Sequence, residues 1–151
     1  MDMIKTLGDA GIIPVIVIED LDKAVPLANA LVKGGLPVLE VTFRTSCAAE
    51  AIAKIKAEVP GAILIAGTVL TLKQLVAAKE AGAEACVAPG FDPAIVKAAN
   101  ELGIPFCPGV ATASELSQAL FRTLRVNMRI NQCSSSVTST PRPVSFSQIL
   151  A

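Results

Sequence analysis

An acidic side chain interrupts an apolar run in the segment Val38-Leu39-Glu40-Val41-Thr42-Phe43-Arg44. Because side chains alternate between the two faces of a strand, Glu40 and Arg44 share one face. At roughly 3.3 Å per residue, they lie about 13 Å apart on a straight strand, which is too far for a direct ion pair. Burying an unpaired carboxylate costs free energy, unless its pKa rises until the group is protonated and neutral. A small acid bound between Glu40 and Arg44 would use both side chains.

Each of these two residues has a functional and a structural interpretation. In a dry site, Glu40 would act as a general acid and base with a pKa raised toward neutrality. Alternatively, it is a strand-end carboxylate paired with a lysine from a neighbouring unit. Arg44 would bind a carboxylate or phosphate through its forked guanidinium, or it is a solvated surface arginine.

Other candidates follow later apolar runs. Thr68 could offer its hydroxyl and backbone N–H to a carboxylate, since Gly67 would allow close approach; alternatively, its hydroxyl starts a helix. Pro89-Gly90 and Pro108-Gly109 are more typical of turns than of ligand contacts. The lysines all fall in predicted helices or at their ends, where none is placed to lose its proton and act as an amine nucleophile. They are Lys5, Lys23, Lys33, Lys54, Lys56, Lys73, Lys79 and Lys97.

The elements that must position these residues follow a repeated pattern. Apolar runs begin near residues 12, 37, 62, 84 and 104, and a helical segment follows each one. Capping patterns mark helix starts at Asp20, at Thr71 with Gln74, at Asp92-Pro93, and at Thr112 with Glu115. Thr45 or Ser46 is expected to open the helix after the central strand. Five βα units are typical of an α/β fold with a parallel sheet.

The strand exits favour a (βα)8 TIM-barrel type over an open doubly wound sheet. Arg44-Thr45, Gly67-Thr68, Pro89-Gly90 and Pro108-Gly109 are short polar or small turns that would converge at one rim. The GxGxxG fingerprint of dinucleotide binding is missing after the first strand. We therefore predict a barrel, of which about five units are present.

Composition and charge exclude several classes of function. The 151 residues carry no net charge, which gives no reason to expect nucleic acid or a membrane as a partner. The four cysteines are far apart and histidine is absent, so no metal site is expected. We interpret the cysteines as buried thiols of a cytosolic protein. The apolar run at residues 12–18 is too short for a membrane span, so we expect a soluble, cytoplasmic protein.

The pattern changes near residue 120. From Phe121 to Ala151 the sequence has six Ser and four Arg, but no Gly, Asp, Glu or Lys. We predict a partial barrel domain over residues 1–120 and an irregular or disordered tail over residues 121–151. A truncation or a shifted reading frame after about residue 120 would produce such a change.

Five segments together resemble one enzyme family, the 2-keto-3-deoxy-6-phosphogluconate aldolase / 4-hydroxy-2-oxoglutarate aldolase family. They are Ile13-Pro14-Val15-Ile16, Leu39-Glu40-Val41-Thr42-Phe43-Arg44-Thr45, Ala66-Gly67-Thr68-Val69-Leu70, Ala88-Pro89-Gly90-Phe91 and Pro108-Gly109-Val110-Ala111-Thr112. The resemblance implies a homotrimer of (βα)8 barrels that needs no cofactor. It also implies class I cleavage of a keto-acid aldol to pyruvate and an aldehyde, through a Schiff base. By the same resemblance, Glu40 transfers protons, Arg44 and Thr68 hold the pyruvate carboxylate, and Pro89 lines the pocket.

One residue of the family pattern has no match. The resemblance implies a Schiff-base lysine in a Lys-Phe-Phe-Pro segment beyond the Thr112 motif. That region here reads Arg129-Ile130-Asn131-Gln132-Cys133-Ser134, and no lysine follows Lys97. Arginine cannot substitute, because its guanidinium stays protonated. We therefore expect an aldolase lineage but no useful imine formation by the chain as written. The alternative is a non-catalytic fragment that binds a keto acid or assembles a barrel with another chain.

Overall fold

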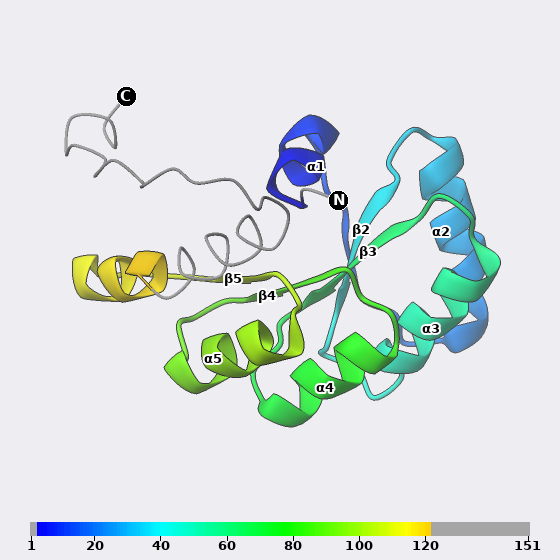
Figure 1. The fold of residues 1–151 in the computed structure, drawn as a ribbon. Helices are drawn as coiled ribbons and strands as arrows, with labels where there is room; N and C mark the ends of the chain where they lie inside the picture. Colours follow the sequence, from blue (N-terminus) through cyan, green and yellow to red (C-terminus); the bar gives the residue numbers. More distant parts are fainter. Residues whose placement is uncertain (1–2, 122–151) are drawn as a thin grey trace, which may run out of the picture.

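The computed structural model of the chain describes residues 3–121. Its sheet has five parallel strands in the order β1-β2-β3-β4-β5 (Figure 1). The strands are β1 (Val15–Ile16), β2 (Val38–Thr42), β3 (Ile63–Gly67), β4 (Ala85–Ala88) and β5 (Phe106–Pro108). Apart from Phe121, the predicted tail lies outside the described residues, so its irregular structure stays a prediction.

Helices connect the strands, and side-chain caps begin several of them. The helices are α1 (Met3–Ala10), η1 (Leu21–Lys23), α2 (Ala24–Lys33), α3 (Ala48–Glu58), α4 (Leu72–Glu80) and α5 (Pro93–Leu102), and a further helix covers residues 113–121. Asp20, Thr71 and Asp92 accept backbone N–H bonds at the starts of η1, α4 and α5. The Thr112 hydroxyl accepts from the Glu115 N–H at 3.2 Å, and the Glu115 carboxylate accepts from the Thr112 N–H at 3.0 Å. These four predicted caps are confirmed.

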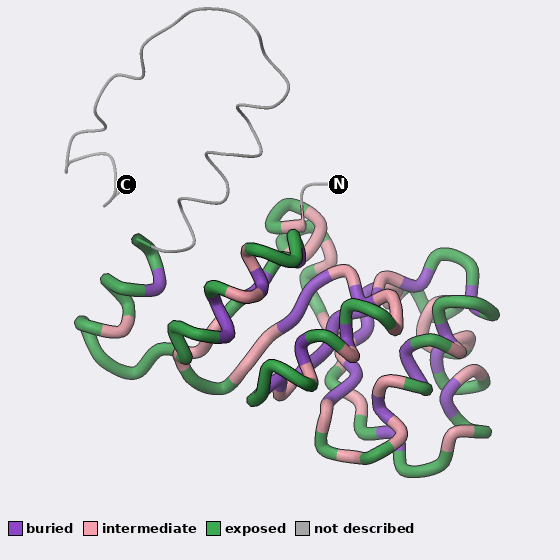
Figure 2. The backbone as a smooth tube through the Cα atoms, turned by 60° about the horizontal axis from the view of Figure 1, so that its bottom comes forward, coloured by how far each residue is buried: buried purple, intermediate pink, exposed green. Residues whose placement is uncertain are grey.

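The two faces of the sheet are covered differently. Helices α2 to α5 lie on one side of the sheet (Figure 1), and their side chains pack with Leu39, Val41 and Leu64 in the larger core. On the opposite face, α1 packs against a smaller cluster that includes Val38 and Ile65. Buried residues concentrate along the central strands β2 and β3, whereas much of the outer helix surface is exposed (Figure 2). A doubly wound sheet would reverse its strand order and place helices on both faces. The sequential order with α2 to α5 on one face therefore confirms the barrel-type prediction.

Some predicted boundaries were wrong. The first strand was expected over residues 12–18, but β1 contains only Val15 and Ile16. The helix after β2 begins at Ala48, without a side-chain cap from Thr45 or Ser46. Its N-cap is Cys47, whose thiol donates to the Ile18 carbonyl at 3.1 Å. This long-range bond to the exit of β1 fixes the helix start, which local capping rules do not take into account.

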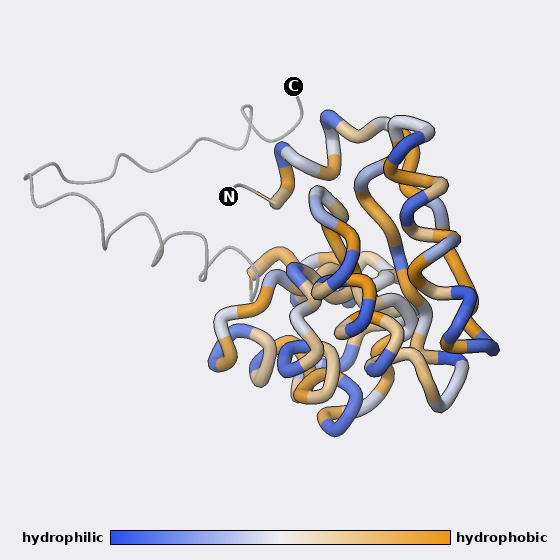
Figure 3. The backbone as a smooth tube through the Cα atoms, turned by 90° about the vertical axis from the view of Figure 1, so that its right-hand side faces the viewer, coloured by the Kyte–Doolittle hydropathy of each residue, from blue (hydrophilic) through white to orange (hydrophobic). Residues whose placement is uncertain are grey.

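The helices are amphipathic, while one edge of the sheet stays apolar and exposed. Hydrophobic and hydrophilic residues alternate along the helices (Figure 3). Val15 and Val17, at and just beyond β1, are 56% and 45% exposed. Within residues 3–121, no helix combines the length and the apolar character that a membrane crossing needs. The same residues contain no group of His, Cys, Asp or Glu side chains that could hold a metal ion.

Candidate active site

Glu40 lies at the middle of the central strand β2, among buried side chains. In the parallel register it pairs with Val15 of β1 and Ile65 of β3, and its N–H donates to the Pro14 carbonyl at 3.0 Å. The other four residues of β2 are buried, whereas Glu40 is half-buried. Thr42, two residues further along the same face, is fully buried and donates its hydroxyl to the Ile16 carbonyl at 3.4 Å. The strand therefore carries one ionisable group, Glu40, among buried neighbours.

Burial changes the acidity of this group. Desolvation raises the pKa of the Glu40 carboxyl above its ordinary value of 4.5, and the positive charge of Arg44 offsets part of the rise. No side chain among residues 3–121 forms an ion pair with Glu40 at 4.0 Å or less. The structural alternative, a lysine partner from a neighbouring unit, is therefore not observed in the described part of the chain. A half-buried carboxyl with a raised pKa and no fixed partner is suited to proton transfer.

Arg44 lies beyond the end of β2. The prediction that it shares a straight strand with Glu40 is therefore wrong. The chain leaves β2 after Thr42 and turns, so Arg44 is exposed at the rim. Two bonds fix this turn: the Phe43 N–H donates to the Gly67 carbonyl at 2.7 Å, and the Gln74 side-chain amide donates to the Phe43 carbonyl at 3.4 Å. The estimate of about 13 Å for a straight strand therefore does not apply, and the arginine acts on Glu40 through its charge.

Gln74 has a supporting role that the sequence analysis missed. Besides its bond to Phe43, its side-chain oxygen accepts from the Leu70 N–H at 2.8 Å. It thus connects the first turn of α4 to the exits of both β2 and β3. The capping pattern with Thr71 singled it out, but that pattern is local and gives no indication of the contact with β2.

Thr68 adopts a strained backbone conformation. Its φ is +58°, the one positive φ of a non-glycine residue in residues 3–121. A β-branched residue rarely adopts this region, which costs on the order of 1–3 kcal/mol. Both neighbours are held: the Gly67 carbonyl accepts from Phe43, and the Val69 N–H donates to the Val87 carbonyl at 3.1 Å. Since Thr71 caps α4, the alternative of Thr68 as a helix-start residue is wrong.

The remaining exits lie beside each other, as the rim prediction required. The Gly109 N–H donates to the Ala88 carbonyl at 2.8 Å, which joins the exits of β4 and β5. A Cβ at Gly109 would approach the Pro89 carbonyl carbon to 2.6 Å, so this glycine permits close backbone contact. Pro89 itself is exposed. The four exits, with Arg44, Thr68 and Pro89, therefore follow one another along the carboxyl edge of the sheet.

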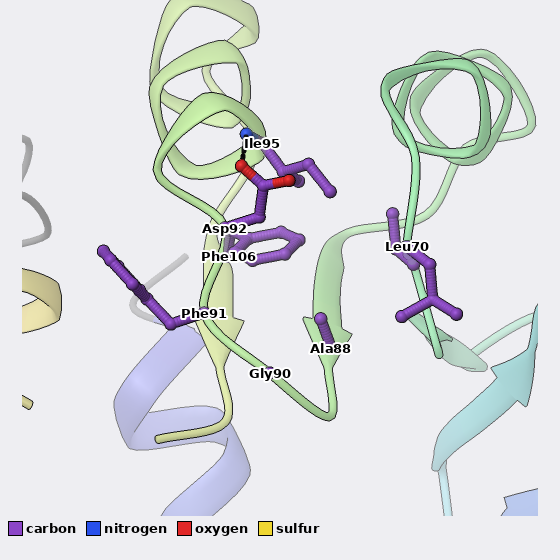
Figure 4. A pocket seen from close by; sticks show the side chains of 8 residues that line it. Leu70, Ala88, Gly90, Phe91, Asp92, Ile95 and Phe106 are labelled. Carbon is purple, nitrogen blue, oxygen red and sulfur yellow. Dashed lines mark hydrogen bonds between the residues drawn. The ribbon is translucent and has the colours of Figure 1, made fainter. Parts of the chain in front are cut away.

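A cavity of about 200 Å³ lies beside these exits (Figure 4). None of the candidate residues Glu40, Arg44 and Thr68 lines it. Asp92, at its wall, is already occupied as the cap of α5, accepting from the Ile95 N–H at 3.4 Å. The lining is mostly apolar and consists of Val69, Leu70, Ala88, Gly90, Phe91, Asp92, Ile95 and Phe106. We do not assign the reaction to this cavity.

The lysines lie in helices, as predicted. All eight are within η1 or the α-helices, and none is on a strand. Lys56, for example, pairs with Glu84 at 2.8 Å on the surface. In the described part of the chain, no ammonium group is therefore supplied by a strand to the face that carries Glu40.

Comparison with known proteins gives a consistent result. The chain is 53% identical over 105 residues to the KHG/KDPG aldolase of Escherichia coli K12, an alignment that covers 70% of this chain and 49% of that protein. The 2-keto-3-deoxy-6-phosphogluconate aldolase of Zymomonas mobilis ZM4, solved with 3-phosphoglycerate, superposes with a TM-score of 0.75 at 48% identity, covering 80% of this chain and 57% of the other.

A third relative was solved with a covalent intermediate. The KDPG aldolase of Legionella pneumophila, with pyruvate captured at low pH as a carbinolamine, gives a TM-score of 0.70 at 43% identity, covering 73% of this chain and 53% of that one. The chain spans about half the length of the curated relatives it matches. The family model of KDPG and KHG aldolase matches residues 3–127. This match and the identities together show that the chain belongs to the KDPG and KHG aldolase family.

Proposed function

We propose that this chain binds a small keto acid of the pyruvate class at the carboxyl edge of its sheet, as part of a class I aldolase (a carbon–carbon lyase). Glu40 transfers protons, Arg44 and Thr68 hold the substrate carboxylate, and Pro89 borders the pocket. The observation that carries the proposal is the half-buried Glu40 carboxyl, whose pKa is raised and which forms no ion pair within 4.0 Å among the described residues. The names of the relatives support an aldol of pyruvate as the substrate class.

In the proposed site, Arg44 supplies a positive charge and Glu40 supplies an acid–base group. Arg44 at the exposed turn offers a fork that matches a carboxylate. The strained Thr68 points to a conformation held for function rather than for stability. Glu40 lies deeper and is partly desolvated, which raises its pKa and suits it to exchange a proton with a bound substrate. A keto acid spanning these positions would have its carboxylate at the rim and its reacting carbons nearer to the strand.

Pyruvate binding to the full chain tests the proposal directly. A chemical-shift titration should show saturable binding, and Arg44→Ala should weaken it about 10- to 100-fold, as expected for loss of a charged hydrogen bond. Lys33→Ala removes the same charge at the other end of the sheet and is the matched control. Equal affinity in the parent and Arg44→Ala would refute the role of Arg44, and absence of binding would refute the proposal.

Imine formation is a separate question for this chain. With pyruvate and borohydride, we expect intact-mass analysis to find no adduct, because the lysines lie on helices and none follows Lys97. A trapped adduct on any lysine would contradict this expectation. In a chain that carries the family's lysine, Glu40→Gln should lower turnover by about 10²-fold or more.

The exposed sheet edge favours a second candidate, barrel assembly with another copy of the chain. Val15 and Val17 are about half exposed beside β1, and a free strand edge can pair with another chain. Sedimentation of the full chain over a range of concentrations distinguishes the cases. A sharp shift to a defined trimer, the assembly that the family resemblance implies, would support assembly. Polydisperse material would refute it.

A further inference from the structure

Gly67 is the last residue of β3, opposite Thr42 in the register with β2. Glycine in a strand weakens it, because it has no side chain to pack and its unfolded state is more disordered. A backbone requirement does not explain this glycine, since its φ is not in the left-handed region that glycine favours. Some other feature must account for the missing side chain.

The neighbour is Glu40. A Cβ built on Gly67 would lie 2.7 Å from the Glu40 carboxyl carbon and 2.8 Å from its Cγ, with the Oε1 atom closer still. These three are the nearest heavy atoms to that position, and all belong to Glu40. The glutamate side chain therefore leaves β2 sideways and lies over the backbone of Gly67, next to the strained Thr68.

We propose that Gly67 is a positioning residue for Glu40: by having no side chain, it lets the carboxyl group lie across β3 beside Thr68. The role extends the proposed function and rests on it only for its effect on the substrate. Without the glycine, the carboxyl would have to move away from β3. The proton-transfer group would then leave the position from which it reaches a substrate held at Thr68.

The first test follows the Glu40 carboxyl itself. In full-length chain labelled with ¹³C at the glutamate carboxyl, the Glu40 signal is assigned by its loss in Glu40→Gln and titrated with pH. Gly67→Ala should return the pKa of Glu40 toward its ordinary value, because the displaced group gains water. Gly90→Ala is the matched control, since a Cβ there meets nothing within 4 Å and its φ is not left-handed. An unchanged Glu40 titration in folded Gly67→Ala would overturn the proposal.

A double-mutant comparison keeps the test valid if Gly67→Ala folds poorly. Gly67→Ala should lower the urea midpoint. Adding Glu40→Ala should restore it, because the three clashing atoms of Glu40 are then gone. The same loss in both backgrounds would overturn the proposal. Pyruvate titration separates the role of Gly67 from the proposed function. If the parent chain binds no pyruvate, the proposed function is refuted. The Glu40 titration and the double mutant still decide the role of Gly67.

Discussion

The strained backbone at Thr68 leads to a prediction in which stability and binding change in opposite directions. Replacing Thr68 with glycine removes the cost of the left-handed conformation, about 1–2 kcal/mol for a residue with a Cβ. The glycine also increases the entropy of the unfolded chain, which takes back about 0.4–1 kcal/mol. The net gain lies between about 0 and 1.6 kcal/mol, and we expect Thr68→Gly to be more stable by about 0.5–1 kcal/mol, near the middle of that range.

Urea denaturation of the full chain measures this change. With a slope typical of small domains, the midpoint should rise by about 0.3–0.6 M. Thr71→Gly is the matched control: Thr71 has φ −138°, so no strain is relieved, and its cap bond to the Gln74 N–H is lost. That variant should be less stable by a few tenths of a kcal/mol.

The same substitution removes a hydroxyl from the proposed carboxylate site. A hydrogen bond to a charged group contributes about 1.5–3 kcal/mol, so pyruvate affinity should fall by about 10- to 100-fold. A urea midpoint of Thr68→Gly below that of the parent would show that the φ of +58° stores no strain. Unchanged pyruvate affinity would show that the hydroxyl does not hold the carboxylate.

Three further predictions test the core, the carboxyl and the thiols. Leu39→Ala, at a fully buried position, should lower the free energy of unfolding by about 2–5 kcal/mol in urea; a loss under about 1 kcal/mol would contradict the packing of β2. Folding favours the protonated form of Glu40, because its pKa is raised. The stability that this form contributes is fully present below about pH 4.5 and is lost as the pH rises through the folded pKa. Glu40→Gln should therefore be more stable than the parent at pH 8 but not at pH 4, and a difference independent of pH would refute the sign. The prediction of buried thiols holds for Cys86 but is wrong for Cys107, which is exposed. Burial raises the pKa of the Cys86 thiol to about 12, so iodoacetamide should label Cys107 and spare Cys86 in the folded chain by mass spectrometry; equal labelling would contradict this.

Much of the fold could be predicted from local signals. Asp92 followed by Pro93 defines a helix start by chemistry that needs no tertiary partner, and the structure has that cap. Short apolar runs predicted the five strands, because the strands of a covered parallel sheet are nearly continuously apolar. The start of α3 was missed because Cys47 bonds to Ile18, a contact between residues far apart in the sequence.

The site was predictable in its residue types but not in its geometry. Glu40 was conspicuous because a carboxylate on an apolar strand is rare. The left-handed Thr68 was not predictable, because its two neighbours are held by bonds from distant parts of the chain, Phe43 just beyond β2 and Val87 in β4. The contact of Gly67 with the Glu40 side chain depends on strand register, and the sequence had suggested only that this glycine admits a ligand.

The short helix α1 covers part of the sheet face that carries Glu40. Met3, Leu7 and Ala10 press against Val38 and Ile65, on the same face as Glu40 and toward the amino ends of the strands. A charged keto acid of the proposed kind would lose hydration against these apolar side chains. Approach from the carboxyl ends of the strands, where the polar exits lie, avoids that loss.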